Sequence, residues 1–576
     1  MPPAALSRRQ DMVDDEAPAL SPILRELREV IHEGSVALDL ESELRRLADA
    51  HSDAATAEDL RRLAVAFGYY PSREGNPYWG PMIVLSNGSQ YPADLDTIEP
   101  ELPELWAKIV ALDPPALVQA RLADLLWCRR EGGRPYVFGH RAIDAYLVLA
   151  QDASRTVDRL DRVDDGARAM SIARELNDNG RVGGAAELLT DLARQELAEP
   201  HPAPGIVFRA LEPLVPDCPD GLEDERQRFL LNAVEAYERD PFHYQSASEL
   251  YASTLPADQR TAVYAAVVDS WEAAADTSDG LTRLLHLERA IELAKLHDLS
   301  DRLDGLRVKT QRIDPADLGM QTVRSEVEIV AMDEILGLLV HETWADTIAA
   351  IGSYGPPTGT RETNLEAVQQ QRGAAPFQAV ISRTKLGFAN SIIWRAESGT
   401  EDRDRLELAE IESFRATYTS FYVMAALDTA YKKLGAPTTQ ALTEIFSTNH
   451  IEPSVATKFA RGVTLYLSEE YELAALYLLP YIEACIRHLN NQAGLVVILE
   501  PRGTKPGGVK TLGTLISQMT DVLDRDWCRY LESTLTDPLG HNLRNRALHG
   551  LMDAVSKSDA ALLVHIVCFL STLRAG

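Results

Sequence analysis

The clearest pattern of hydrophobic and polar positions lies in the last quarter of the chain. Between Leu467 and Leu489, apolar residues recur at steps of three and four, which is typical of one face of an amphipathic helix. A second apolar stripe runs along 512–535, and two closing helices are predicted at about 541–556 and 559–574. Because the last of them is apolar nearly all round, we expect it to be the buried member of a four-helix bundle.

Helical patterns also fill the first part of the chain. Amphipathic segments predict helices at 22–33, 56–68 and 115–130. They are interrupted at 71–98 by a segment rich in Gly, Pro, Asn and aromatic residues, where we expect a long ordered loop with a short strand at Met82–Leu85. Such a loop either packs over the core or forms a binding surface.

Short helices separated by Asn- and Gly-rich turns continue through the middle of the chain. They are predicted at 167–177, 184–197, 223–238 and 281–296. This arrangement is typical of an irregular α-solenoid, although the strict tetratricopeptide consensus is absent. The solenoid either offers a surface for a protein partner or is a helical layer without one.

Residues 346–404 are less regular, and β-branched and aromatic alternation at 376–388 predicts a short hairpin. A long helix follows from about 405 to 435, and a shorter one at 438–446. We therefore predict an all-α fold, in which an irregular helical-repeat body precedes the C-terminal four-helix bundle. The expected parts are a flexible leader at 1–20, an N-terminal helical domain at 21–155, the solenoid at 156–345, a connecting region with the long helix at 346–437 and the bundle at 438–576.

Charge adds a constraint on partners. The 576 residues include 57 Lys+Arg against 87 Asp+Glu, a formal net charge of -30. This acidity disfavours a protein that coats nucleic acid or an anionic membrane with its whole surface. The charge is uneven, since residues 501–576 hold nine Lys and Arg against seven Asp and Glu. The difference reflects either chance over a short window or one place where a polyanion can approach.

Cysteine usage and the chain start predict a cytoplasmic protein. The five cysteines form no CxxC pair, which argues against a disulfide framework or a thiolate zinc site. The acidic N-terminus lacks the apolar core of a signal peptide. No stretch reaches about 18 uninterrupted apolar residues, so we expect no membrane segment.

Several polar residues predict ordinary structural roles. Glu483 and Arg487 are four apart on a helix and predict a surface ion pair. His565 lies in an apolar helix and is expected to be a core histidine. The HExxH and GxSxG patterns and paired His/Asp clusters are absent, so we expect no cofactor and no metal.

The segment His541–Gly550, HNLRNRALHG, carries the strongest candidate chemistry. Asn545 and His549 are four apart and therefore neighbours on one helix face, which the long Arg544 side chain can also reach. Arginine offers a bidentate fork to phosphate, and histidine moves protons near neutral pH, so the group suits phosphodiester chemistry. Taken alone, the same residues also fit a helix end with solvated arginines.

This segment resembles the RxxxxH motif of the HEPN superfamily (higher eukaryotes and prokaryotes nucleotide-binding). DPLGHNLRNRALHGLM, with FARGVTLYLSEEYELAALYLLPYIEACIRHLN upstream, is similar to a bacterial domain-of-unknown-function family, four-two-zero-nine, which has a HEPN-like C-terminal domain. The resemblance covers about 440–576, and ARLADLLW at 120–127 is similar to a segment that this family often carries ahead of it.

The resemblance implies a metal-independent endoribonuclease, toxin-like or acting in anti-phage defence. Arg544 would bind the scissile phosphate, and His549 would act as base on the ribose 2′-OH or as acid to the leaving 5′-oxygen. Asn545 would position His549 or a phosphate oxygen. A 2′,3′-cyclic phosphate end and a homodimer that joins two motifs are implied as well. The alternative is a non-catalytic helical protein whose HEPN fold serves dimerisation or binds RNA or nucleotides.

Further cationic residues are candidates for RNA contact. They are Arg502, Lys505, Lys510, His541 and Arg546. The first three lie in the Gly/Pro-rich loop 501–510, which lacks P-loop spacing and a predicted strand before it, and which either contacts phosphates or is a solvated connector. The other two flank the motif and are either accessory or ordinary surface residues.

Overall fold

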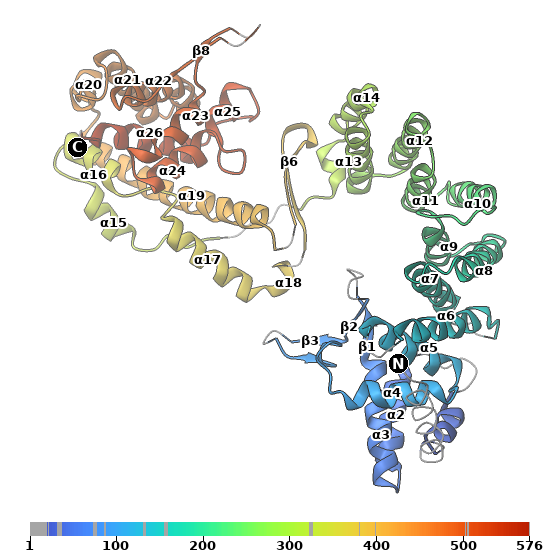
Figure 1. The fold of residues 1–576 in the computed structure, drawn as a ribbon. Helices are drawn as coiled ribbons and strands as arrows, with labels where there is room; N and C mark the ends of the chain where they lie inside the picture. The colour runs from blue at the N-terminus through green and yellow to red at the C-terminus, as the bar shows by residue number, and fades with distance from the viewer. Residues whose placement is uncertain are drawn as a thin grey trace. The chain divides into compact units, whose positions relative to one another are not determined.

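The chain is all-α, and it divides into two compact units, Met1–Lys309 and Thr310–Gly576, which are described separately below (Figure 1). The division falls inside the segment 156–345 that was expected to be one solenoid. The computed structural model describes residues 20, 22–31, 37–72, 78–85, 88–130, 134–154, 159–321, 326–379, 381–397, 399–501, 503 and 506–574. The leader expected at 1–20 therefore lies outside the described residues, apart from Leu20.

The first unit begins with helices that follow their predicted patterns. The Asp53 side chain caps helix α3 by accepting a hydrogen bond from the Thr56 backbone N–H at 2.9 Å. Helix α5 is buried along most of its length, so it forms the centre of this part of the core. The helices predicted at 56–68 and 115–130 are confirmed. The bounds here are α2 Ala37–Ala50, α3 Ala54–Val65, α4 Glu101–Ala111, α5 Ala116–Arg129 and α6 Pro135–Gln151.

The segment expected to be a long loop contains two antiparallel hairpins. β1 (Tyr69–Pro71) pairs with β2 (Trp79–Pro81), and β3 (Ile83–Val84) pairs with β4 (Gln90–Tyr91). The strand predicted at Met82–Leu85 is confirmed as β3, but its partner β4 and the other hairpin, β1–β2, were missed. The first hairpin is held by burial, since the rings of Tyr69 and Trp79 pack in the core. It was missed because Gly and Pro residues interrupt the alternation of apolar and polar positions that predicts a strand.

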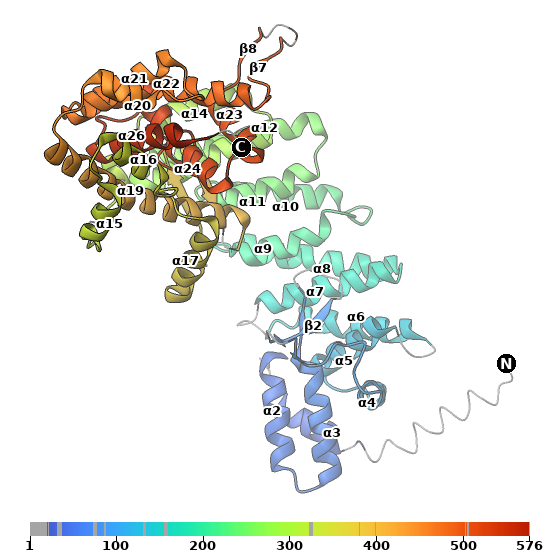
Figure 2. The same cartoon turned by 90° about the vertical axis from the view of Figure 1, so that its left-hand side faces the viewer.

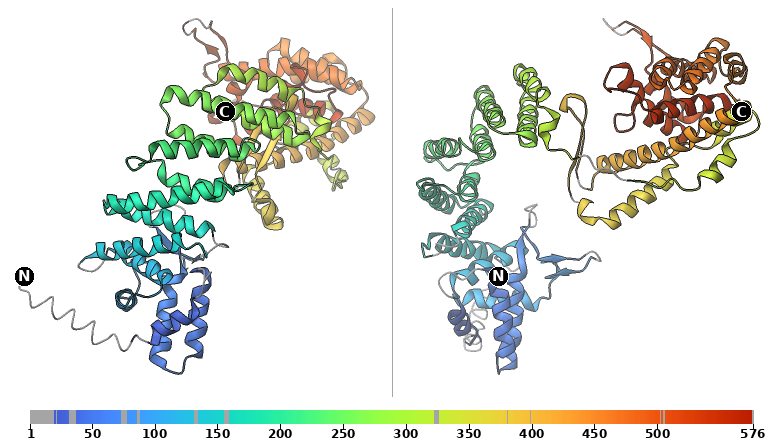
Figure 3. Two further views of the ribbon diagram at one scale, coloured as in Figure 1. Left: turned by 90° about the vertical axis from the view of Figure 1, so that its right-hand side faces the viewer. Right: turned by 180° about the vertical axis from the view of Figure 1, so that it is seen from behind.

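Eight further helices follow, and from α5 to α13 each helix contacts the next in the chain. Figure 3 shows them as a succession from teal to green. The four helices predicted here are confirmed as α7, α8, α10 and α13, while the assignment as a solenoid repeat stays a prediction. The bounds are α7 Arg159–Glu175, α8 Asn179–Leu197, α9 Pro204–Leu211, α10 Glu223–Ala236, α11 Pro241–Ser253, α12 Ala257–Asp276, α13 Gly280–Leu296 and α14 Ser300–Gln311.

The second unit is more helical at its start than expected. Two helices, α16 and α17, lie where 346–404 was predicted to be irregular; threonine side chains cap both N-termini, a local signal the pattern did not reveal. A hairpin exists, but 376–379 is helical and the two strands meet across a turn with Asn390 at φ 57°. The bounds are α15 Met332–Leu339, α16 Trp344–Ser353, α17 Arg361–Ala374, α18 Pro376–Ala379, β5 Arg383–Leu386, β6 Ile392–Ala396, α19 Glu401–Leu434 and α20 Thr439–Phe446.

Three predicted C-terminal helices have different bounds. The stripe from Leu467 is split, because the chain turns at Glu469 (φ 64°) before α22 begins. The helix expected at 512–535 is also split, because Asp524 accepts hydrogen bonds from two backbone N–H groups and starts a new helix. The one expected at 541–556 has only six residues. The bounds are α21 Pro453–Leu467, α22 Tyr471–Gln492, α23 Leu512–Gln518, α24 Arg525–Leu535, α25 Leu543–Leu548 and α26 Lys557–Thr572.

The last helix is the buried member of this unit, as predicted. Every side chain of α26 from Ala560 to Leu570 is buried. It contacts α16, α19, α21 and α22, so two of its neighbours come from before residue 438 (Figure 2). The set of helices that pack around α26 therefore differs from the four-helix bundle that was expected at 438–576. Within the described residues, every helix is too short or too polar to cross a lipid bilayer.

His565 is confirmed as a core histidine, and it predicts acid sensitivity. Its Nδ1 lies 3.1 Å from the Tyr530 hydroxyl, and burial lowers its pKa to about 3. An unfolded histidine has a pKa near 6.5, so between pH 6.5 and 3 only the unfolded chain binds this proton. The unfolding free energy should then fall with falling pH by up to about 1.4 kcal/mol per pH unit from this group.

Urea unfolding between pH 7 and pH 4 checks this prediction. His565→Gln removes the titration, so the variant should show a pH slope smaller by about one bound proton. Equal slopes for the two proteins would refute it.

Candidate functional site

Helix α25 and its two ends carry the residues singled out from the sequence. The chain enters through Gly540, where a Cβ would lie 2.2 Å from the Ser533 carbonyl oxygen, so only glycine lets this turn pack on α24. Leu543 is buried and anchors the helix, which contacts α22 and α24. The helix ends at His549, followed by Gly550 at φ +65°. This turn and this helix end explain why the helix is so short.

Arg544 is held from two sides. Its Nη1 donates to Asn545 Oδ1 at 3.1 Å, and its Nη2 lies 3.3 Å from Glu483 Oε2 on α22. The other oxygen of that carboxylate accepts from Arg487 Nη2 at 2.6 Å. Glu483 thus bridges two guanidinium groups, and its side chain is 17% exposed. The predicted Glu483–Arg487 pair is confirmed, but its contact with Arg544 was missed.

Asn545 and His549 have opposite environments. Asn545 uses both ends of its amide, accepting from Arg544 and donating from Nδ2 to Asn542 Oδ1 at 2.8 Å. The His549 backbone N–H donates to the Asn545 carbonyl at 3.1 Å, which confirms that these residues stack one turn apart. His549 is exposed, and its ring has no hydrogen bond to any described residue. The arginine and the amide are therefore held in place, and one helical turn further along the chain lies an exposed histidine.

The flanking candidates lie in different places. His541 is mostly buried: Nε2 lies 3.2 Å from the Ser413 carbonyl oxygen, Nδ1 faces Asp559, and burial lowers the pKa of the ring. It is therefore not the surface residue that one alternative expected. Arg546 is half-buried, and its Nη1 donates to the carbonyl oxygen of His541 at 3.3 Å.

Part of the segment 501–510 is a strand, since β8 (Gly508–Val509) pairs with β7 (Ile498–Leu499). The expectation that no strand precedes the loop is wrong, because two-residue strands leave no periodic signal. Lys510 Nζ donates to Gln518 Oε1 at 2.8 Å. Arg502 and Lys505 lie outside the described residues.

The positive φ of Gly550 predicts a measurable cost for a side chain there. Gly550→Ala should lower the unfolding free energy by about 1 kcal/mol, because no heavy atom lies within 4 Å and only backbone strain acts. Gly183→Ala, in the interior of α8 and also without neighbours, should instead raise it by about 0.5–1 kcal/mol. Urea denaturation measures both, and a stabilising Gly550→Ala would contradict the assigned helix end.

Ligand sets that hold metal ions combine several His, Cys, Asp or Glu side chains. Among the described residues, no cluster of three or more His, Cys, Asp or Glu side chains could hold a metal ion. The polar groups described around α25 are the arginines, the amides, the imidazole of His549 and one carboxylate, that of Glu483, which is paired with Arg544.

Comparison with known proteins places one family on the N-terminal part. A family described as "Domain of unknown function (DUF7380)" matches residues 26–183. No curated protein matches the chain, and no solved structure does. The matched region contains the ARLADLLW segment at 120–127 and does not extend to α25.

Proposed function

We propose that the second unit is a HEPN-type endoribonuclease that cleaves RNA without a metal ion. The observation that carries the proposal is the arrangement on α25, where the side chains of Arg544 and Asn545 are hydrogen-bonded to each other. His549 is exposed to solvent one helical turn away. The resemblance of this segment to the RxxxxH motif supports the same reaction. We place the protein in the cytoplasm, where RNA is available.

The proposed step needs a phosphate ligand and proton transfer. Arg544 N–H groups bind the scissile phosphate and stabilise the charge that develops on it. His549 accepts the proton of the ribose 2′-OH as that oxygen bonds to phosphorus, and the bond to the 5′-oxygen breaks. The leaving 5′-oxygen takes a proton from an acid, which gives a 2′,3′-cyclic phosphate and a 5′-hydroxyl.

A second copy of the chain supplies the acid in this proposal. One chain carries one Arg544–His549 motif, and the reaction uses an acid and a base at once. A homodimer that brings two motifs together provides both. The role of the first unit would then be to restrain or direct the nuclease, with a protein partner or in defence against phage.

RNA cleavage in the presence of EDTA tests the proposal. The full chain should cut a mixed RNA substrate, and His549→Ala should not. His488→Ala is a matched control, because this histidine also lies in the second unit, where its Nδ1 is 3.3 Å from Glu452. RNA binding without cleavage by the wild-type protein would favour the non-catalytic alternative.

A further inference from the structure

Helix α21 differs in charge from the chain as a whole. Its 15 residues, Pro453–Leu467, include Lys458 and Arg461 and no aspartate or glutamate. Arg461 is exposed and Lys458 is half-buried, and neither side chain forms an ion pair with a described residue. Because the whole chain carries a formal net charge of -30, a helix without carboxylates is a favoured place for a polyanion to approach.

Two tyrosines of the neighbouring helix lie beside these cations. Helices α21 and α22 pack against each other (Figure 2), and Tyr477 and Tyr481 are one turn apart on α22. Their ring centres are 5.5 Å apart. The Lys458 Nζ lies 5.6 Å from the centre of the Tyr481 ring and 5.9 Å from that of Tyr477. The Arg461 guanidinium lies 5.8 Å from the centre of the Tyr477 ring. These four residues are called the α21–α22 cluster below.

The contacts within the cluster are loose. Cation–π attraction extends to about 6 Å from the ring centre, so both cations lie near its outer limit. The flexible Lys458 and Arg461 side chains can therefore leave the rings for a phosphate at little cost. Both tyrosines are half-buried, so each keeps part of its side chain exposed to solvent. Free positive charge and partly exposed aromatic rings together are typical of surfaces that bind single-stranded nucleic acid.

The exposed face of α22 joins the cluster to the proposed nuclease site. Glu483 follows Tyr481 by two residues, and its Oε2 lies 3.3 Å from Arg544 Nη2. At 3.6 residues per turn, Leu473 and Pro480 lie between the tyrosines and Glu483 on the helix surface, and both are exposed. A strand that crosses this face can contact the cluster while one of its phosphates lies at Arg544.

We propose that the α21–α22 cluster binds single-stranded RNA beside the proposed nuclease site, an inference that rests on the function proposed above. Bases stack on the rings of Tyr477 and Tyr481, while Lys458 and Arg461 contact phosphates. Every base has a π-face and every nucleotide carries a phosphate, so this mode of binding tolerates many sequences. A duplex keeps its bases paired and stacked inside the helix, where the tyrosines do not reach them.

Fluorescence anisotropy of the full chain tests the preference for single strands. The His549→Ala protein is used, so that the RNA stays intact during the titration. The probes are a fluorescein-labelled RNA of about 12 nucleotides without self-complementarity and the blunt duplex of the same sequence. The single strand should bind at least about tenfold more tightly, because only its bases are free to stack. Equal binding of the two forms, or no binding of the single strand, overturns the proposal.

Matched variants in the same background locate the site. Lys458→Gln with Arg461→Gln should weaken binding of the single strand about tenfold. It should also reduce the slope of log affinity against log salt by about 1.4, since each phosphate contact contributes about 0.7. Tyr481→Ala should weaken binding as well, and Tyr481→Phe should keep it, because the ring is the contact. Arg405 lies 4.6 Å from the Trp394 ring centre in the same unit, and Arg405→Gln should change neither affinity nor slope.

Two readouts separate this proposal from that of the nuclease. Circular dichroism first confirms that each variant is folded. If the affinity and the salt slope of the Lys458 and Arg461 double variant are unchanged, the RNA site is wrong, even where His549-dependent cleavage is observed. If binding depends on the cluster but the wild-type protein leaves RNA intact in EDTA, the RNA site stands and the nuclease proposal fails.

Discussion

His549→Ala is expected to slow RNA cleavage by a factor of about 10²–10⁴, the usual contribution of a general acid or base. The reason is chemical and not structural, because the ring is exposed and makes no hydrogen bond to a described residue. The unfolding free energy should therefore stay within about 0.5 kcal/mol of the wild-type value. Initial rates on a labelled RNA and a urea titration measure the two effects.

Arg544 and His549 should act as one unit in this reaction. Arg544→Ala is expected to lower the rate about 10²–10³-fold, because it removes the guanidinium group that binds the phosphate in the proposed reaction. If both groups serve the same transition state, the double variant should be no slower than the slower single variant, within about threefold. Multiplied effects would show that Arg544 and His549 act independently, and a similar loss in His488→Ala would show that the effect of the histidine is not specific to the site.

Arg168→Ala is expected to lower the unfolding free energy of the first unit by about 3–5 kcal/mol, the cost of leaving a buried charge unpaired. The charge left behind is that of Asp124, which is fully buried and loses both guanidinium bonds. The same variant removes the guanidinium group that lies 3.6 Å from the centre of the Tyr78 ring. Urea unfolding followed by circular dichroism gives the magnitude.

An exposed pair serves as the control for this prediction. Arg302 contacts Asp269 at 2.5 Å, but both side chains are well exposed, so Arg302→Ala should cost about 1 kcal/mol or less. Replacing both buried partners, as Asp124→Leu with Arg168→Met, should recover part of the loss, because no unpaired charge remains. Equal costs for the Arg168 and Arg302 variants would show that the buried pair does not organise the unit.

Helices in which apolar residues recur periodically could be predicted from the sequence, but the residues at which these helices begin and end could not. α26 was predicted as a buried helix because nearly every residue is apolar, and burial from Ala560 to Leu570 confirms it. The break between α23 and α24 was missed because Val522 continues the apolar stripe, although it is exposed in the structure. The decisive signal was the Asp524 cap, a local hydrogen bond that hydrophobic periodicity does not contain.

The candidate site shows the same limit. Arg544, Asn545 and His549 were grouped by spacing, because residues one turn apart on a helix are neighbours. The bridge from Glu483 to Arg544 joins α22 to α25, and no spacing rule predicts a contact between residues so distant in sequence. The charge of Arg544 could have suggested an ion pair, but it does not identify Glu483 as the partner.

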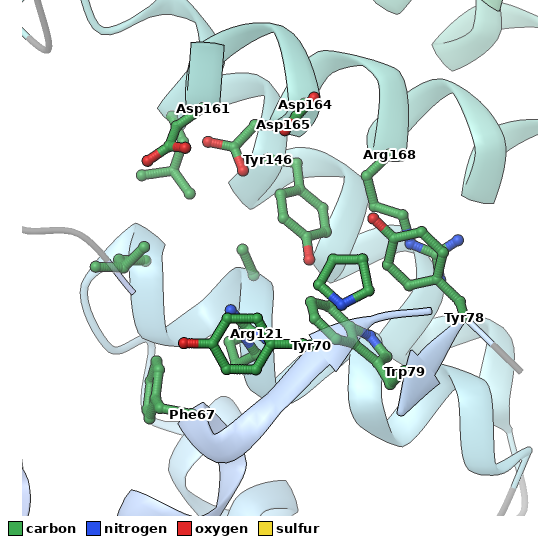
Figure 4. A pocket seen from close by; sticks show the side chains of 14 residues that line it. Phe67, Tyr70, Tyr78, Trp79, Arg121, Tyr146, Asp161, Asp164, Asp165 and Arg168 are labelled. Atoms are coloured by element: carbon green, nitrogen blue, oxygen red, sulfur yellow. The ribbon is translucent and has the colours of Figure 1, made fainter. Parts of the chain in front are cut away.

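A pocket of the first unit, lined by β2 and by helices α5, α6 and α7, was only partly visible in the sequence (Figure 4). The aromatic segment 71–98 was recognised as a loop that either packs over the core or forms a binding surface, and its residues Tyr78 and Trp79 line this pocket, while Trp79 is also buried. Their counterparts Asp124 and Arg168 lie in helices whose patterns predict only amphipathic packing. The tertiary fold alone brings the carboxylate, the guanidinium and the rings together.

The chemistry of the RNA ends tests the central claim most directly. Wild-type protein should cleave RNA in EDTA and leave 2′,3′-cyclic phosphate ends, detected by their resistance to phosphatase until acid opens the ring. DNA of the same sequence should remain intact, because it lacks the 2′-hydroxyl that attacks the phosphorus. The Arg544→Ala and His549→Ala proteins should produce no such ends. Cleavage that leaves 3′-hydroxyl ends, or that persists in both variants, would contradict the assignment of the reaction to helix α25.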